Sequence, residues 1–147
     1  MTPTSPPRGR FAPSPTGPLH LGSLTAALAS YLMAKSQHGQ WLIRIEDIDP
    51  PREIAGMAER QLKTLANFGL LPDEPVLYQS ERAAVYEATL EKLLREDKAF
   101  LCSCSRTQLA AQGGIHRRCM AAIDPERTAI RLRVDDRTIA FTDGVYG

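Results

Sequence analysis

Strand-like and helix-like segments alternate from the start of this chain, and that order limits the folds available to it. A short strand is predicted at residues 9–13, and a cluster of proline and glycine ends it at once. A helix follows over residues 19–38 and a β-rich strand over residues 41–46, with Gly39 as the expected C-cap between them. The residues expected on the buried face of this helix are Leu21, Leu24, Ala27, Leu28, Tyr31 and Leu32.

The alternation continues through the rest of the chain. A second amphipathic helix is predicted over residues 53–68, an extended segment over 76–80, and a third helix over 81–97 with Ser80 as its N-cap. Further strands are predicted at residues 99–102, 129–134 and 138–142. The residues expected to be buried on the two helices are Ile54, Met57, Leu62, Leu65 and Phe68, then Val85, Leu90, Leu93 and Leu94. This order predicts an α/β fold in which helices flank parallel strands and ligands bind at the carboxyl ends of the strands.

Composition narrows the class of protein. With 18 basic and 17 acidic residues the formal net charge is +1. The chain therefore lacks the strong positive electrostatic field that is typical of nucleic-acid-binding proteins, and any RNA contact must be local. Residues 1–10 lack the apolar segment of a signal peptide, and the apolar stretch at residues 24–34 is too short to span a bilayer. We therefore expect a cytoplasmic, monomeric protein that does not enter a membrane.

The segment between the first strand and the first helix has the composition of a polyanion-binding turn. Residues 10–23 contain an arginine, a histidine, hydroxyl side chains and glycines. Glycine lets a phosphate approach the backbone, the helix N-terminus supplies N–H groups, and His20 can donate to a phosphate oxygen. The segment is neither a G-x-G-x-x-G fingerprint nor a Walker loop, which disfavours dinucleotide and P-loop sites. The alternative is a proline-rich turn in which His20 only caps the helix.

Two oppositely charged side chains end the first two predicted strands. Arg10 is suited to hold a carboxylate through two parallel hydrogen bonds, and Glu46 is suited to hold an ammonium group. An amino acid with an acidic side chain offers both groups. Two alternatives remain open. Glu46, Asp47 and Asp49 could form an acidic loop or a metal-binding turn, and Arg44 could form a structural ion pair with Glu46.

Three cysteines and a histidine have the spacing of a zinc site. Cys102-x-Cys104 and His116-x2-Cys119 supply three thiolates and one imidazole, which are four ligands of types that a closed tetrahedral Zn²⁺ site uses. One structural zinc ion per chain is therefore expected. The alternative is a set of cysteines without a metal, beside an exposed histidine.

The turn also carries a family resemblance. The run P-S-P-T-G-P-L-H-L-G-S resembles the His-x-Gly signature of class I aminoacyl-tRNA synthetases, and R-F-A-P-S-P-T-G is similar to its form in the glutamate-specific branch. The resemblance implies a catalytic role on ATP for His20, Gly22 and Ser23, with Ser23 in place of the family's second histidine. The implied ATP-binding residues, acting with Mg²⁺, are Pro13, Ser14, Gly17, His20, Gly22 and Ser23. The implied glutamate-binding residues are Arg10, Phe11, Ala12, Pro13, Ser14 and Glu46.

Three further runs resemble one branch of that family, the glutamyl-queuosine tRNA(Asp) synthetases. They are I-R-I-E-D-I-D-P-P-R-E at residues 43–53, Y-Q-S-E-R at 78–82 and F-L-C-S-C-S-R at 100–106. The resemblance implies ATP-dependent activation of L-glutamate to glutamyl-adenylate and its transfer to the queuosine base of tRNA(Asp). The alternatives are a fragment of an ordinary glutamyl-tRNA synthetase and a non-catalytic zinc-bearing module that binds RNA or protein. Members often have tyrosine as the third metal ligand, one residue further from the last cysteine, so His116 departs from the pattern.

The resemblance also implies a domain organisation. It predicts a tail at residues 1–8, the first half of a Rossmann-like catalytic domain at 9–98, and a zinc-binding insertion with the start of the following strands at 99–147. Family members carry roughly as much sequence again, including a loop whose lysine neutralises ATP phosphates. We therefore expect little or no activity from these 147 residues alone.

Overall fold

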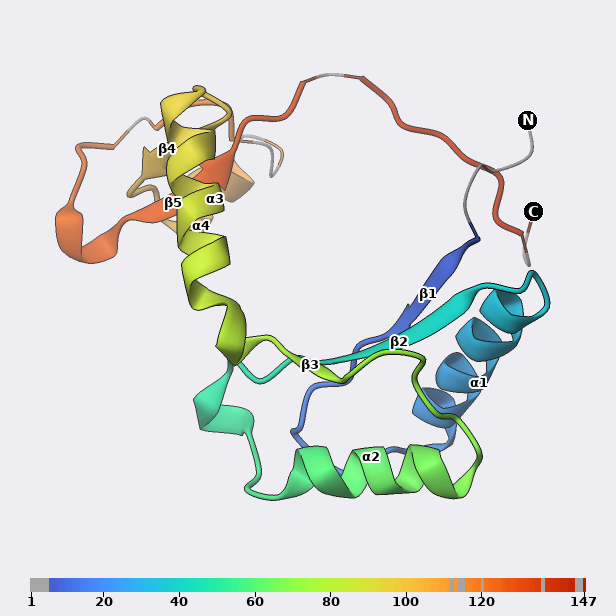
Figure 1. Ribbon diagram of the computed structural model, residues 1–147. Helices are drawn as coiled ribbons and strands as arrows, with labels where there is room; N and C mark the ends of the chain where they lie inside the picture. Colours follow the sequence, from blue (N-terminus) through green and yellow to red (C-terminus); the bar gives the residue numbers. More distant parts are fainter. Residues whose placement is uncertain (1–5, 112, 114–115, 120, 136, 145–146) are drawn as a thin grey trace. The chain divides into compact units, whose positions relative to one another are not determined.

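The computed structural model describes residues 6–111, 113, 116–119, 121–135, 137–144 and 147 (Figure 1). The chain divides into two compact units, Met1–Ala83 and Ala84–Gly147. Most of the predicted tail, residues 1–5, lies outside the described residues, and Arg8 already belongs to a strand. The domain limits expected from the sequence, 9–98 and 99–147, stay a prediction.

The first unit is a parallel three-stranded sheet with two helices. Its elements are β1 (Arg8–Phe11), α1 (Leu21–Lys35), β2 (Gln40–Ile45), the 3-10 turn η1 (Pro50–Arg52), α2 (Met57–Asn67), β3 (Leu77–Tyr78) and the 3-10 turn η2 (Ser80–Arg82). The strand order is β1-β2-β3, and both pairings are parallel. The parallel α/β sheet predicted from the alternating pattern is thereby confirmed.

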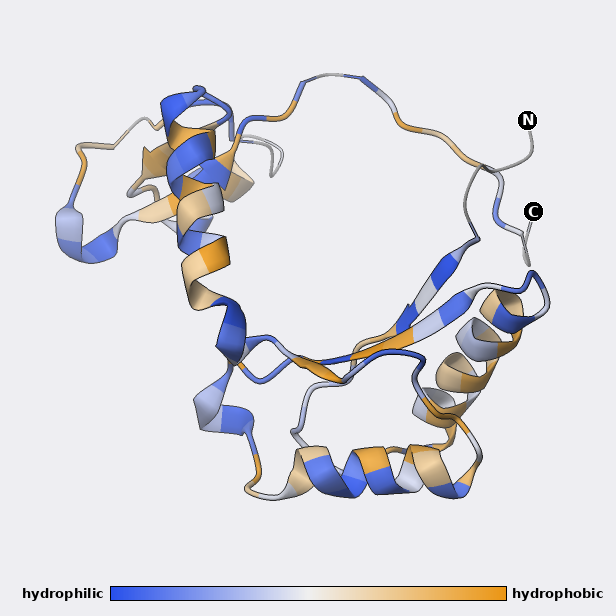
Figure 2. Ribbon diagram, viewed as in Figure 1, coloured by the Kyte–Doolittle hydropathy of each residue, from blue (hydrophilic) through white to orange (hydrophobic). Residues whose placement is uncertain are grey.

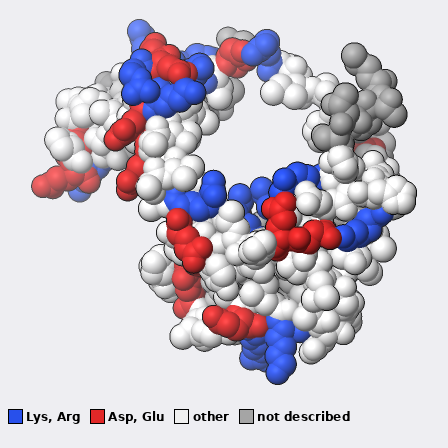
Figure 3. Space-filling model, viewed as in Figure 1, with Lys and Arg blue, Asp and Glu red and all other residues white. Residues whose placement is uncertain are grey.

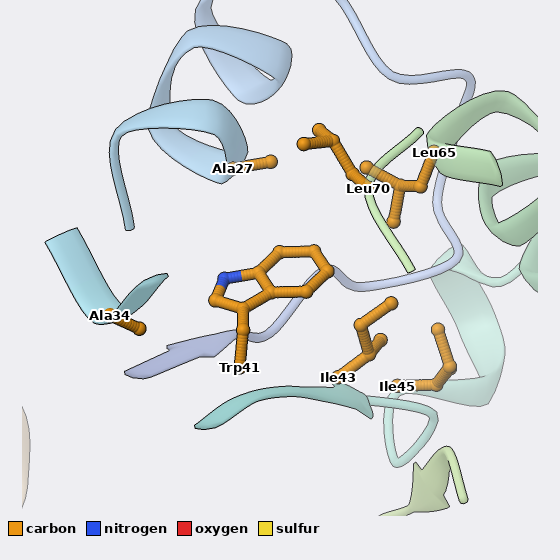
Figure 4. Close-up of a cluster of buried hydrophobic side chains, with 7 residues drawn as sticks. All are labelled: Ala27, Ala34, Trp41, Ile43, Ile45, Leu65 and Leu70. Carbon is orange, nitrogen blue, oxygen red and sulfur yellow. The ribbon is translucent and has the colours of Figure 1, made fainter. Parts of the chain in front are cut away.

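The two faces of this sheet differ because strand side chains alternate in direction. On β2 every second side chain is buried, namely Trp41, Ile43 and Ile45. Helices α1 and α2 both pack on that face, as the ribbon and its hydropathy colouring show (Figures 1 and 2). The core cluster drawn in Figure 4 consists of Ala27, Ala34, Trp41, Ile43, Ile45, Leu65 and Leu70. Among the described residues of the first unit, no helix covers the opposite face.

Trp41 is the centre of this core and is bonded on several sides. It is 0% exposed, its indole Nε1–H donates to Ser30 Oγ at 2.9 Å, and its ring meets Tyr31 edge-on with centroids 5.4 Å apart. Its backbone N–H donates to Asp73 Oδ2 at 2.6 Å, and Asp73 also pairs with Lys35. The indole thus packs in an apolar site with its one polar atom satisfied, as a buried tryptophan requires.

The predicted buried faces of the helices are only partly correct. On α1, Leu24 and Tyr31 pack against the core as predicted, whereas Leu21, Leu28 and Leu32 are exposed. Ala27 and Ala34 are buried, and the close approach of the helix to the sheet is possible because they lack bulk. Helix α1 is apolar on several sides, so spacing alone does not select one face. On the second helix Met57 and Leu65 are buried and Leu62 is partly buried; Ile54, which precedes α2, and Phe68 are exposed.

The second unit contains one antiparallel strand pair. Its elements are α3 (Ala83–Arg95), which begins at the unit boundary, β4 (Ala99–Cys102), α4 (Arg106–Ala110), the 3-10 turn η3 (Pro125–Arg127) and β5 (Ala129–Leu132). Strand β4 has the predicted bounds, but no residue of α3 is buried, and Val85 and Leu90 of its predicted stripe are exposed. Residues 138–142 form no strand, because β-propensity without a pairing strand does not stabilise one, and Ile139 is 90% exposed. No helix in the described part of the chain is long and apolar enough to cross a membrane.

Ser80 does not cap a helix as predicted. Its backbone N–H and its hydroxyl both donate to Asp47, at 2.9 and 2.6 Å. The residue that precedes η2 is Gln79, which makes no side-chain capping bond. Ser80 is the first residue of η2, and its side chain links the segment after β3 to the segment after β2 instead of capping a helix.

Gly39 has a different role from the predicted C-cap. Helix α1 ends at Lys35, and the residue with left-handed backbone is His38, with φ 55°. A Cβ on Gly39 would overlap the carbonyl oxygen of Pro7 and lie 2.9 Å from that of Ala34. The position thus requires glycine because the chain entering β1 passes against the chain entering β2.

We expect Gly39→Ala to lower the free energy of unfolding by about 1–3 kcal/mol, since two of the three obstructing atoms belong to the backbone and the third to the ring of Pro7. Urea unfolding measures the loss. Gly17→Ala is the matched control, because a Cβ there meets nothing within 4 Å. Equal stability of the two variants would contradict this account of Gly39.

Candidate functional site

A hollow of about 470 Å³ lies at the carboxyl end of β1, beside the start of α1. We call it the turn hollow. Its lining residues are Phe11, Ala12, Pro13, Ser14, Thr16, Gly17, Pro18, Leu19, His20, Ser23 and Gln61. It thus contains most of the residues predicted for ATP and several of those predicted for glutamate.

His20 sits at the N-cap of α1. Its Nδ1 accepts a hydrogen bond from the backbone N–H of Ser23 at 3.3 Å, so the capping alternative describes one contact that the ring makes. A ring nitrogen that accepts carries no proton, which places the proton of a neutral imidazole on Nε2. Helix capping through Nδ1 and hydrogen-bond donation from Nε2–H to a phosphate oxygen therefore use different nitrogens and are compatible.

Gly22 gives the His20 ring its space. A Cβ at Gly22 would lie 3.1 Å from His20 Cε1 and 3.2 Å from Nδ1, closer than ordinary van der Waals contact. The histidine and the glycine two residues later are thus coupled by packing. Gly17, in contrast, has open space around the position of a Cβ.

Gln61 ties the turn to α2, and sequence reasoning missed it. Its side-chain Nε2 donates to the carbonyl of Ser14 at 3.0 Å and to that of Gly17 at 2.7 Å. The residue is 2% exposed. It lies between Met57 and Leu65 at four-residue spacing on the buried stripe of α2. A single amide in an otherwise apolar stripe was the signal that could have revealed it.

A second hollow, of about 260 Å³, lies on the sheet face that α1 and α2 leave uncovered. Its basic lining residues are Arg8, Arg10, Arg44 and Arg82, and we call it the arginine hollow. Figure 3 shows basic and acidic side chains mixed over this part of the molecule. Arg8 pairs with Glu74 at 2.7 Å, whereas no ion pair is found for Arg10 or Arg82 among the described residues. Arg8 and Arg82 were not predicted as site residues.

The predicted glutamate-binding residues therefore divide between the two hollows. Arg10 lines the arginine hollow, whereas Phe11, Ala12, Pro13 and Ser14 line the turn hollow. The division follows from the alternation along β1, in which Arg10 and Phe11 point to opposite faces. Glu46 continues from β2, and its backbone N–H donates to the carbonyl of Pro13 at 2.9 Å.

The three acids after β2 each have a separate partner. Glu46 Oε1 accepts from Arg44 Nη2 at 2.6 Å, so the ion-pair alternative is confirmed, and Asp49 pairs with Arg52. Asp47 accepts from Ser80. Burial acts to raise the pKa of Asp47, but the hydrogen bonds from the Ser80 hydroxyl and from backbone N–H groups outweigh it and hold the pKa below its usual value. Among the described residues these acids do not assemble into a metal-binding group.

The second unit gathers the predicted metal ligands. Ligand atoms of Cys102, Cys104 and His116, all buried, lie within 4.8 Å of one another. Cys119 is outside that group, but its Sγ is 3.8 Å from the Sγ of Cys104, and it also accepts from the N–H of Ser103 at 3.4 Å. No disulfide joins the three cysteines.

The His116 ring supports a metal at this cluster. The ring is buried, and neither Nδ1 nor Nε2 has a hydrogen-bond partner in the described part of the chain. A buried imidazole normally finds a partner for its nitrogens, and a metal bond would supply one. The alternative of an exposed histidine is therefore wrong, and the residues present fit a tetrahedral site with sulfur and nitrogen ligands.

The comparisons with known proteins agree with this arrangement. The family model "tRNA synthetases class I (E and Q), catalytic domain" matches residues 8–137, and the chain belongs to this family. It is 62% identical to the glutamyl-Q tRNA(Asp) synthetase of Xanthomonas campestris pv. campestris (strain 8004), over 95% of this chain and 47% of that protein. It is 52% identical to the protein of the same name from Shewanella oneidensis, over 100% of this chain and 50% of that protein. The chain thus spans about half the length of these relatives.

A solved structure shows the same likeness. The glutamate tRNA ligase of Elizabethkingia meningosepticum, in complex with its amino acid, is 38% identical and superimposes with a TM-score of 0.64. The match covers 74% of this chain and 23% of the ligase. The resemblance to the glutamate branch of class I synthetases, predicted from the sequence, is confirmed.

Asp47→Asn removes the carboxylate that joins the ends of β2 and β3. Because the folded-state pKa is below the unfolded one, the carboxylate stabilises the fold above the usual pKa of 3.8, and this contribution is lost as the pH falls below that value. We expect the stability difference between the native chain and the variant to be largest near neutral pH and to shrink in that acidic range. Urea unfolding from pH 7 to pH 3 measures it, with the exposed Glu91→Gln as control. A pH-independent difference would contradict the assignment.

Proposed function

We propose that this chain provides the ATP- and glutamate-handling part of an enzyme that activates L-glutamate to glutamyl-adenylate and transfers it to the queuosine base of tRNA(Asp). The observation that carries the proposal is the turn hollow, which His20 lines at the N-terminus of α1, with Gly22 beside it leaving room for the ring. The names of the relatives at 52% and 62% identity support the same reaction. A tRNA substrate is consistent with the cytoplasmic location that we expect from the sequence.

In the proposed activation step, a carboxylate oxygen of glutamate attacks the α-phosphorus of ATP, and the bond to the β-phosphate breaks to release pyrophosphate. The Nε2–H of His20 donates to a phosphate oxygen, Gly22 leaves room for the ring, and the hydroxyl of Ser23 donates to the phosphates as well. The N-terminus of α1, the positive end of the helix dipole, stabilises the negative charge of the same phosphate. Mg²⁺ supplies further neutralisation of the phosphates when it accompanies ATP. Pro13, Ser14 and Gly17 form the adjoining wall.

Glutamate binding is proposed for the charged residues at the strand ends. Arg10 has an exposed guanidinium with no ion pair among the described residues, and it is suited to a carboxylate. Glu46 is suited to the ammonium group. Its carboxylate would then accept hydrogen bonds from both the ammonium and Arg44. Phe11, Ala12, Pro13 and Ser14 line the other hollow, the turn hollow, and would contact glutamate from that side.

A second candidate is transfer of glutamate to its own tRNA. The solved structure that resembles this chain is named a glutamate tRNA ligase, which favours this alternative for the acceptor but not for the activation step. Both candidates use the same turn hollow, so the acceptor RNA separates them.

The experiment that tests the function follows labelled glutamate. The chain, alone and joined to the remaining residues of the Xanthomonas campestris relative, is incubated with ATP and with tRNA(Asp) that has or lacks queuosine. We expect label on the queuosine-containing RNA from the joined protein and little from the chain alone. Gly22→Ala should lower the rate about tenfold or more, because its Cβ displaces the His20 ring.

The control and the contradicting outcomes are defined by the structure. Gly144→Ala introduces a Cβ that meets nothing within 4 Å and should keep the native rate. Label on tRNA(Glu) in place of tRNA(Asp) would support the ordinary ligase. Absence of label on every RNA would contradict both enzyme proposals and favour a binding module.

We also propose that the second unit holds one structural Zn²⁺ ion through Cys102, Cys104, His116 and Cys119. Three of these residues already form a compact buried group, and Cys119 adjoins it. Four protein ligands leave no open position, so the ion would stabilise the unit without taking part in the reaction. The small buried cluster of this unit, Phe100 with two of the cysteines, gives it little other apolar support.

We expect the purified chain to contain about one zinc per molecule by elemental analysis. His116→Asn should weaken zinc binding by about 100-fold or more, since even indirect partners of a metal contribute about 10–100-fold. His38→Asn is the matched control, because His38 is exposed and asparagine tolerates its left-handed backbone. A native chain that binds no zinc, or equal affinities of the two variants, would contradict the site.

A further inference from the structure

The turn between β1 and α1 has its carbonyl oxygens bonded to the rest of the unit. The carbonyl of Pro13 accepts from the N–H of Glu46 at 2.9 Å, and that of Pro15 accepts from the N–H of Ile54 at 3.0 Å. Gln61 donates to two more, those of Ser14 and Gly17. Four acceptors within five residues are thus engaged by donors from the segment just after β2 and from the α2 region.

The N–H groups of the same turn have no such partners. No hydrogen bond from the N–H of Ser14, Thr16 or Gly17 is found among the described residues. In a planar trans peptide the N–H points opposite to the carbonyl of the preceding residue. The bonds to Pro13 and Pro15 therefore direct the N–H groups of Ser14 and Thr16 away from Glu46 and Ile54.

Gln61 engages two of the turn's three X–Pro peptide units, which have no N–H of their own. The carbonyls of Ser14 and Gly17 each precede a proline, so these peptides offer only a negative oxygen. Left without a donor, such an oxygen would repel a phosphate in the turn hollow. The side-chain amide of Gln61, which also lines that hollow, donates a hydrogen bond to each of the two oxygens and so reduces this repulsion.

Packing alone does not explain a glutamine at this position. The side chain lies in the buried stripe between Met57 and Leu65, where an apolar residue would pack without polar atoms. Its own Oε1 is buried without a hydrogen-bond partner in the described part of the chain. The amide thus leaves one buried acceptor unsatisfied, a cost that an apolar residue would avoid.

We propose that Gln61 is a positioning residue for phosphate binding, which fixes the turn so that a phosphate chain meets the N–H groups of Ser14, Thr16 and Gly17 and not free carbonyl oxygens. Concave runs of backbone N–H groups bind anions in this way. The inference rests on the proposed function in that ATP is the phosphate ligand. Gln61 itself touches the turn and not the reacting atoms.

Inorganic tripolyphosphate is the probe, because it lacks both the adenosine and the amino acid. It is titrated into the ¹⁵N-labelled chain and followed by amide NMR. In the native chain we expect the signals of Ser14, Thr16 and Gly17 to shift. In Gln61→Leu the affinity should fall about 30-fold, which corresponds to the loss of two hydrogen bonds of ordinary strength. The affinity for glutamate, measured in parallel, should stay within about twofold of the native value.

Gln37→Leu is the matched control, since Gln37 is exposed and its side-chain amide donates to the carbonyl of Met33 near the end of α1, away from the turn. It should keep the native affinity for tripolyphosphate. Gln61→Glu, whose carboxylate has no donor, should lose affinity like Gln61→Leu. Thermal unfolding of each variant shows whether the lost affinity is accompanied by unfolding.

Two results would overturn the proposal. The first is native tripolyphosphate affinity in a folded Gln61→Leu or Gln61→Glu. The second is a native chain in which the three amide signals do not respond to the probe, and this result decides the matter even if both variants fail to fold. An amide response in the native chain, together with no glutamate transfer by the joined protein, would refute the proposed function and leave the role of Gln61 standing.

Discussion

The first unit depends on the two-residue alternation of β2, the central strand of the parallel sheet. Trp41, Ile43 and Ile45 point to one face and form the core, which draws α1 and α2 to that side. The side chains between them point to the other face, where Arg44 meets the arginines of β1. A shift of one residue in register would exchange the two faces, so core and charged surface are determined together.

The same constraint explains why two hollows flank the sheet. The turn after β1, which contains the histidine, the glycines and the prolines, lies on the face of the sheet that α1 and α2 cover. Arg10 points to the opposite, uncovered face. Hydrogen bonds from Glu46, Ile54 and Gln61 hold that turn from two later segments of the chain. A proline-rich segment that lacks regular structure thus acquires a fixed shape through its neighbours, as a rigid ligand site requires.

The sequence predicted the parallel α/β order because short strands and helices have distinct periods, and it located the polar residues at the strand ends. It predicted buried faces poorly where a helix is apolar on several sides, as at Leu21 and Leu28. The prediction of a strand at residues 138–142 was wrong because a strand forms only when it pairs with another strand, and a local sequence pattern does not show whether such a partner exists. Gln61 was missed because its partners are carbonyls more than 40 residues away in the chain. The cysteine spacing, in contrast, is local and led directly to the buried group around Cys102.

Trp41 is the only tryptophan in the chain, and it lies wholly within the core of the first unit. Its fluorescence emission therefore reports the opening of that unit and is insensitive to the second. Emission would shift to longer wavelength when water reaches the indole, while far-ultraviolet circular dichroism records both units together. The two optical signals, recorded on one sample, can separate the melting of the sheet that bears the turn from the melting of the cysteine-bearing unit without any added label.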